Sequence, residues 1–181
     1  MFKKKLIFSL LALIFVAAVG VGTTVAFITH IAGPIDNTFI IGEIDMTLRE
    51  TAGAKYQLIP GNTYKKDPTV TVKSGSQDCF VFIKITKQND TDRYISYMIS
   101  DGWHPLTNYD GVYYRTVENI TEDAVFPVLK DNLITVKDTV TKEEIQNITS
   151  SPKLIFTAYA IQSSGIDDAK TAYDAILSAE E

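Results

Sequence analysis

The sequence predicts an all-β fold, an antiparallel β-sandwich of the jelly-roll or immunoglobulin-like kind with short peripheral helices, placed after an N-terminal signal peptide. Three observations predict it. About seven or eight short segments alternate apolar and polar residues, with turn residues between them. One segment, at 79–85, is apolar on both faces, as a central strand is. Helical periodicity is confined to the region after residue 141 and to the C-terminal end.

The first 26 residues have the three-part order of a secretory signal peptide. Three lysines precede an apolar stretch, and Thr24-Val25-Ala26 forms a small-x-small cleavage site. We therefore expect a signal peptidase to cut between Ala26 and Phe27. A second interpretation stays open, because residues 6–32 are long enough to span a bilayer and would then remain as a membrane anchor. Glycines and threonines just before the site interrupt that stretch and favour cleavage.

Cleavage after Ala26 would leave an N-terminal arm, 27–36, followed by one β-sandwich domain, 37–181. Removing 26 of the 181 residues leaves 155, enough to bury roughly 70% of the surface of the unfolded chain. Three lysines leave with the signal peptide, so 14 basic residues face 22 acidic ones and the net charge becomes −8. This charge argues against nucleic acid and anionic lipid as partners. The membrane contact expected is through the signal segment, and the expected location is the extracellular matrix or the cell surface.

The first half of the domain contains three strand patterns. Residues 38–50 alternate and predict a single half-buried strand. Turn residues fill 58–68, and a strand follows at 68–73, because proline can begin a strand but not occupy its middle. The segment 79–85 is the central strand. The residues expected to face inward are Ile40, Ile44, Met46, Leu48, Val70, Val72, Cys79, Val81, Ile83 and Ile85.

The second half continues the strands and adds the helices. Asp110-Gly111 favours a tight hairpin turn. Thr141 and Glu144 have the spacing of a capping box, which predicts the start of a short helix. Another helix is expected over 167–179, with one apolar face packed on the sandwich. Segments rich in tyrosine and β-branched residues predict strands at 93–100, 111–117, 124–129, 133–138 and 153–162.

Candidate catalytic and metal-binding residues are few, so we predict a non-catalytic protein without a cofactor or metal. The only histidines are His30 and His104, and neither has the neighbouring glutamate of a hydrolytic zinc site. The single cysteine, Cys79, cannot form an intrachain disulfide and lies in phase with apolar neighbours, which indicates a buried small hydrophobe. The carboxylate pairs 143–144 and 167–168 stand at helix starts, where they compensate the helix dipole.

Six aromatic residues on or beside the predicted strands form a candidate binding surface. Flat rings on a sheet can stack on sugars or peptides. Strands also use the same residue types to fill cores and cover edges, and this packing role is favoured. The six are Tyr94, Tyr97, Trp103, Tyr109, Tyr113 and Tyr114.

The front of the chain combines a lysine-led signal with a strand motif that contains Thr38, Phe39, Gly42, Asp45 and Leu48. Further along stand "DGWHPL", "GVYYR" and "LIFTAYAIQSSGIDDAKTAYDAI". Together these motifs resemble the TasA/camelysin family, exported proteins of Gram-positive bacteria whose signals are removed by a dedicated signal peptidase. The resemblance covers nearly the whole chain. It implies the same cut between Ala26 and Phe27.

For TasA-like members the resemblance implies a β-sandwich subunit of extracellular matrix, or biofilm, fibres. A freed N-terminal segment pairs with the next subunit as an added strand. The arm of this chain suits that role because it is apolar and precedes the first strand, and the residues expected to mediate assembly are Phe27, Ile28, Ile31 and Ile35. Head-to-tail pairing of this kind does not close on itself, so it grows a filament.

The function expected is therefore that of a secreted structural protein that self-associates. Camelysin-like members are described as metalloproteases. This sequence offers no matching zinc ligands, so we do not expect protease activity from it. The alternative is a monomeric cell-surface module that holds a glycan or a peptide on the aromatic surface.

Overall fold

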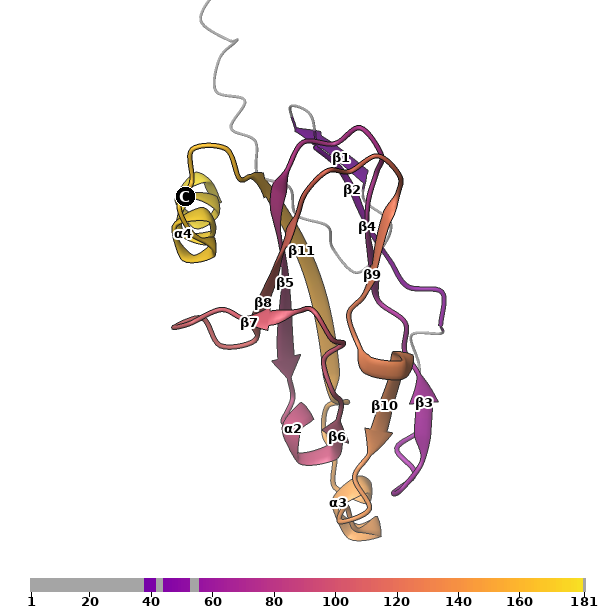
Figure 1. The fold of residues 1–181 in the computed structure, drawn as a ribbon. Coiled ribbons are helices and arrows are strands. Elements are labelled where there is room, and N and C mark those ends of the chain that lie inside the picture. Colours follow the sequence, from indigo (N-terminus) through magenta and orange to yellow (C-terminus); the bar gives the residue numbers. More distant parts are fainter. Residues whose placement is uncertain (1–37, 42–43, 53–55, 181) are drawn as a thin grey trace, which may run out of the picture.

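The computed structural model describes residues 38–41, 44–52 and 56–180. Three antiparallel sheets form the two layers of a sandwich, with sheet A in one layer and sheets B and C end to end in the other (Figure 1). Twenty buried residues from both layers make up one core cluster between them. The predicted all-β antiparallel sandwich is confirmed.

The sheets are built from eleven strands in the described ranges. Sheet A has the order β11 (Lys153–Gln162), β5 (Cys79–Gln88), β8 (Val112–Val117) and β7 (His104–Pro105). Sheet B has the order β1 (Thr38–Ile41), β2 (Ile44–Arg49), β4 (Thr69–Val72) and β9 (Ala124–Pro127). Sheet C has the order β3 (Thr63–Lys65), β10 (Leu133–Val136) and β6 (Ile95–Ser96).

Strand β5 occupies the centre of sheet A because its sequence is apolar on both faces. It pairs with β11 from Gln88 opposite Lys153 to Cys79 opposite Gln162, and with β8 on its other side. The side chains of Cys79, Val81, Ile83 and Ile85 belong to the core between the layers. Phe80 and Phe82 belong to a second cluster on the outer face. The prediction of a central strand at this segment is confirmed.

Sheets B and C are two parts of one interrupted ladder. Strand β3 pairs with β10 in sheet C, and the strands that adjoin them in sequence, β4 and β9, pair in sheet B. Two backbone hydrogen bonds bridge the break, from Lys66 N to Asn132 O at 2.7 Å and from Val128 N to Pro68 O at 2.9 Å. Pro68, which has no amide hydrogen to donate, and the short 3-10 helix η1 (Lys130–Asn132) stand at this break.

Two predicted strands differ in the structure. Residues 38–50 form an antiparallel pair, β1 and β2, with Ile41 opposite Ile44, so the prediction of one continuous strand was wrong. Three apolar residues in a row, 39–41, left the phase of the alternation ambiguous. The segment 93–100 is largely not a strand, because helix α2 (Thr91–Tyr94) occupies its start and β6 keeps two residues.

A local hydrogen-bond network explains the turn at α2. Asn89 and Asp90 both have positive φ values, 58° and 53°, which reverse the chain after β5. Thr91 Oγ1 lies 2.6 and 2.8 Å from the carbonyl oxygens of Gln88 and Lys153, which share its one hydrogen, and it accepts from the Lys153 amide at 3.0 Å. Burial of this threonine between two strand ends therefore overrides the strand propensity of the residues that follow.

Both predicted helices are present. Helix α3 (Lys142–Gln146) begins at a complete capping box, in which Glu144 N donates to Thr141 Oγ1 at 3.2 Å and Thr141 N donates to Glu144 Oε2 at 2.8 Å. Helix α4 (Ala169–Glu180) follows Asp168, whose carboxylate accepts from Thr171 N at 2.8 Å. Its buried face packs on the outer side of sheet A, and Figure 1 shows it beside that layer.

Candidate functional site

The six aromatic residues do not lie together on one face of the molecule. Trp103 is buried, its ring stands edge-on to Phe126 at 6.5 Å, and its Nε1 donates to Pro127 O at 2.9 Å. Tyr94, Tyr97 and Tyr113 pack at the margin of the core between the layers. Tyr109 and Tyr114 pack at the margin of the outer cluster, below α4. Most of this set therefore serves packing, and a shared aromatic surface is not formed.

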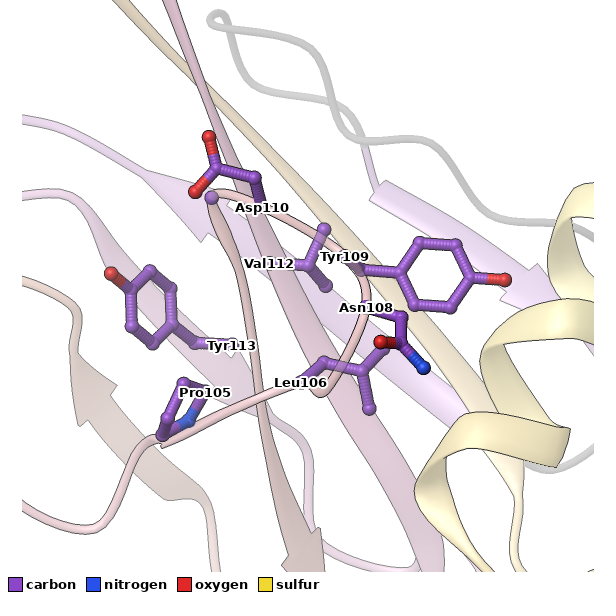
Figure 2. Close-up of a pocket in the computed structure, with 8 residues that line it drawn as sticks. Pro105, Leu106, Asn108, Tyr109, Asp110, Val112 and Tyr113 are labelled. Carbon is purple, nitrogen blue, oxygen red and sulfur yellow. The ribbon is translucent and has the colours of Figure 1, made fainter.

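Two of the six line an open cleft on the hairpin between β7 and β8. The cleft has a volume of about 470 Å³. Pro105, Leu106 and Val112 supply its apolar wall, and Asn108 and Asp110 supply polar side chains. Figure 2 shows the ring of Tyr109 directed toward helix α4, while the ring of Tyr113 lies on the opposite side, next to Pro105.

Backbone hydrogen bonds fix the shape of this hairpin. Leu106 N donates to Val112 O at 2.9 Å, and Val112 N donates to Tyr109 O at 3.2 Å. Asn108 and Gly111 hold positive φ values of 69° and 71°, as turn residues of a tight loop do. The loop is tied to the central strand, because Ile85 N donates to Gly111 O at 2.8 Å.

Helix α4 anchors one side of the hairpin through Tyr109. The Tyr109 hydroxyl donates to the carboxylate of Asp174, which also pairs with Lys170 Nζ at 2.6 Å. The hydrogen bond to Asp174 and burial raise the pKa of Tyr109. The hydrogen bonds from Lys170 and Tyr109 lower the pKa of Asp174. Tyr109 is therefore a positioning residue whose hydroxyl is already occupied.

A second group of charges lies on the Tyr113 side. Lys87 Nζ is 2.9 Å from Asp92 Oδ1 and 5.7 Å from the centre of the Tyr97 ring. The hydrogen bond to Asp92 raises the pKa of Lys87 against the opposing effect of burial, and the negative charge of Asp110 adds to the rise. The Asp110 carboxylate thus interacts electrostatically with Lys87, whose ammonium group already forms an ion pair with Asp92.

The candidate catalytic residues do not form a catalytic group. Cys79 is fully buried, and burial together with the charge of Asp78 raises the pKa of its thiol to about 12, so the reactive thiolate is disfavoured. His104 is exposed, with its ring 5.7 Å from that of Tyr114. Across residues 38–41, 44–52 and 56–180, no group of three or more His, Cys, Asp or Glu side chains is placed to hold a metal ion.

One buried ion pair fastens the segment before β4. Lys66 is 7% exposed, its Nζ lies 2.8 Å from Glu50 Oε1, and the same atom is 5.3 Å from the centre of the Phe156 ring. Tyr56 stacks against this group and donates from its hydroxyl to Lys65 O at 3.0 Å. The pair is largely buried against Phe156, a core residue of β11, so it links the segment before β4 to the opposite layer.

The polar residues of the cleft were not among the predicted site residues. The sequence signal was present as Asn108-x-Asp110-Gly111, a polar turn between two tyrosine-bearing segments, but it was interpreted only as a hairpin turn. The predicted cleavage pair Ala26 and Phe27 and the arm residues Ile28, Ile31 and Ile35 lie outside the described residues. None of the helices that the structure describes has the length and apolarity needed to cross a membrane.

The fold and the cleft define a class of protein, a small two-layer antiparallel β-sandwich with an outer helix and an open hairpin cleft. A comparison of the chain with protein-family models, curated proteins and solved structures finds no match. The resemblance to the TasA/camelysin family stays a prediction from the sequence motifs.

Proposed function

We propose that this protein is a secreted, non-catalytic structural subunit that assembles into extracellular fibres, in which the N-terminal arm of one copy adds a strand to the sheet of the next. The observation that carries the proposal is the edge of sheet A. Strand β11 is ten residues long and, among the described strands, pairs with β5 alone. In an antiparallel pair about half of the backbone groups of an edge strand point away from its partner and can accept another strand.

The other sheet edges are less suited to this role. Strand β7 has two residues, β6 has two, β3 has three, and β1 and β9 have four each. Strand β9 also contains Pro127, which has no amide hydrogen to donate. The length of β11 therefore makes it the preferred acceptor among the edges that the structure describes.

The arm matches this edge in length, and its one proline, Pro34, stands near the end of the segment, so the hydrogen bond that Pro34 cannot donate falls near the end of the added strand. Residues 27–36 would span roughly 33 Å when extended, as β11 does. In an extended chain Phe27, Ile31 and Ile35 fall on the same face, where they could cover apolar side chains at the margin of the sheet. The arm carries no lysine or arginine that would oppose burial. Because donor and acceptor are different surfaces, the contact propagates head to tail.

Deletion of residues 27–36 tests the proposal. Purified secreted protein is followed by sedimentation and electron microscopy over a range of concentrations. We expect concentration-dependent fibres from the intact chain and none from the deletion, because the donor strand is missing. A chain that stays monomeric with its arm freed, or fibres that persist after the deletion, would contradict the proposal; the first result would favour the monomeric binding module.

A cross-linking experiment tests the acceptor. The substitutions Ile31→Cys and Thr157→Cys, the second on β11, are combined in one chain, and the purified variant is treated with a short bis-maleimide reagent. Cys79 is 0% exposed and does not compete for the reagent. We expect dimers and ladders from this pair. The matched control places the second cysteine at the exposed Thr116 on β8, where cross-linking should stay at background. Equal yields from both pairs would show that β11 is not the acceptor.

A further inference from the structure

The cleft on the β7–β8 hairpin has polar groups that nothing in the described part of the chain occupies. The side chains of Asn108 and Asp110 and the hydroxyl of Tyr113 make no hydrogen bond or ion pair there. The neighbouring Tyr109 differs, because its hydroxyl is bonded to Asp174. Asn108 and Asp110 are exposed and Tyr113 is half-buried, so three side chains that can form hydrogen bonds border one open hollow of about 470 Å³.

The frame around these groups is held in place before any ligand binds. Gly111 is fastened to the central strand through Ile85 N, and Tyr109 is fastened to helix α4 through Asp174. Two further backbone bonds close the loop between Leu106 and Val112. A ligand would therefore meet side chains on a fixed backbone, which lowers the entropy cost of binding.

Two rings, those of Pro105 and Tyr113, supply apolar area in the cleft. Pro105 and Tyr113 are directly opposite each other in the β7–β8 pair, and Figure 2 shows their rings side by side. Such a surface can contact the C–H face of a pyranose ring. Around it, a carboxylate accepts from sugar hydroxyls, an amide both donates and accepts, and a phenol does either.

The charges disfavour an anionic ligand. No lysine or arginine lines the cleft, and the nearby Lys87 is paired with Asp92. The Asp110 carboxylate and the net charge of −5 repel anions. From the rings, the free polar groups and the charge, we propose that this cleft binds a neutral pyranose unit of a glycan. The site is independent of the proposed fibre assembly, because it lies on the hairpin at the opposite edge of sheet A from β11.

Saturation-transfer NMR on the full chain tests the proposal, because it detects the protons of weakly bound ligands. The probes are cellotetraose, maltotetraose and chitotetraose, each at about 10 mM, where even a Kd of about 1 mM gives near saturation. We expect transfer to the ring C–H protons of at least one probe. Absence of transfer from all three would overturn the proposal. Binding of oligogalacturonate or of a proline-rich peptide in their place would overturn it as well.

Two conservative variants locate the site. Tyr113→Phe removes the hydroxyl and keeps the ring, and Asn108→Gly removes the amide at a positive φ that glycine accepts. We expect each to weaken binding roughly threefold to tenfold, the effect of one lost hydrogen bond. The matched controls are Tyr114→Phe on the adjacent position and Asn119→Gly, which also has a positive φ, of 54°. Affinities that fall equally in variants and controls, or in none, would overturn this assignment.

Discussion

Gly111 is the single residue on which the shape of the cleft most directly depends. A Cβ at this position would lie 2.6 Å from the carbonyl oxygen of Ile85, and the φ of +71° already disfavours any L side chain. Neither the backbone of the central strand nor the turn can move without breaking the bond between Ile85 N and Gly111 O. Glycine is therefore required at position 111 for two reasons: the positive φ and the lack of space for a Cβ.

We expect Gly111→Ala to lower the free energy of unfolding by about 3 kcal/mol, the sum of a backbone strain and an overpacking cost. Gly75→Ala is the matched control, because Gly75 has a φ of +82° and nothing within 4 Å of the added Cβ. It should cost about 1 kcal/mol, from the backbone alone. Urea denaturation of both variants measures the difference. Equal losses would show that the close approach to Ile85 is not limiting.

Asp67 makes stability depend on pH. Burial opposes its ionisation, but hydrogen bonds from the Thr51 hydroxyl, the amides of Ala52 and Thr51, and Lys65 outweigh this effect and lower the pKa from 3.8 to about 2. Because the folded pKa is depressed, the stabilisation is present above about pH 3.8 and is lost as pH falls toward about 2.

We expect Asp67→Asn to cost about 1–2 kcal/mol at pH 7, less than the full linkage value because solvent screens part of the interaction. The difference between wild type and variant should shrink as the pH falls from about 3.8 to about 2. Denaturation curves at pH 7, 5 and 3 measure it. A difference that is constant across this range would contradict the role of the charge.

Among the elements, helix α4 contributes the packing of the outer face. Tyr173 is 1% exposed and lies between the rings of Phe82 at 5.1 Å and Tyr109 at 4.9 Å. We expect Tyr173→Ala to cost about 3–5 kcal/mol, as truncation of a buried aromatic does. Ser178→Ala, at an exposed position of the same helix, should stay within about 0.5 kcal/mol. Thermal denaturation followed by circular dichroism compares them, and similar losses would indicate that α4 is not docked as described.

The elements also show what the sequence could predict. Strands with an unambiguous pattern, such as β4 with Val70 and Val72 inward and β5 with two apolar faces, were predicted correctly. The failures came where a tertiary contact decides the structure. Thr91 is buried between two strand ends, and β3 exists because β10 pairs with it. The local sequence pattern does not show which distant segment a residue will contact.

The same reasoning applies to the site. Tyr109 and Tyr113, two of the six predicted aromatic residues, line the cleft, but their opposite directions depend on the register of β8 against β5 and β7. Asn108 and Asp110 were not selected, because a polar turn has the same composition with or without a ligand. Their position beside the cleft is a property of the folded hairpin.

At the scale of the whole molecule, the state of the N-terminus decides between a freed arm and an anchor. We expect the protein in culture supernatant to begin at Phe27, because Thr24-Val25-Ala26 has the small-x-small pattern that signal peptidases cut. Intact mass and N-terminal sequencing of supernatant and washed membranes measure this. A chain that still begins at Met1 and is found only with membranes would hold the donor segment in the bilayer and rule out strand donation.

The position of the only tryptophan has a spectroscopic consequence. Trp103 is 6% exposed, has the Arg115 guanidinium 4.9 Å from its ring centre, and bonds to Pro127 of the facing layer. Its indole therefore joins the two layers at the edge opposite β11. Selective excitation of Trp103 therefore reports, without any label, whether the two layers stay packed at this edge. The emission shifts to the red if the layers separate and water reaches the indole ring.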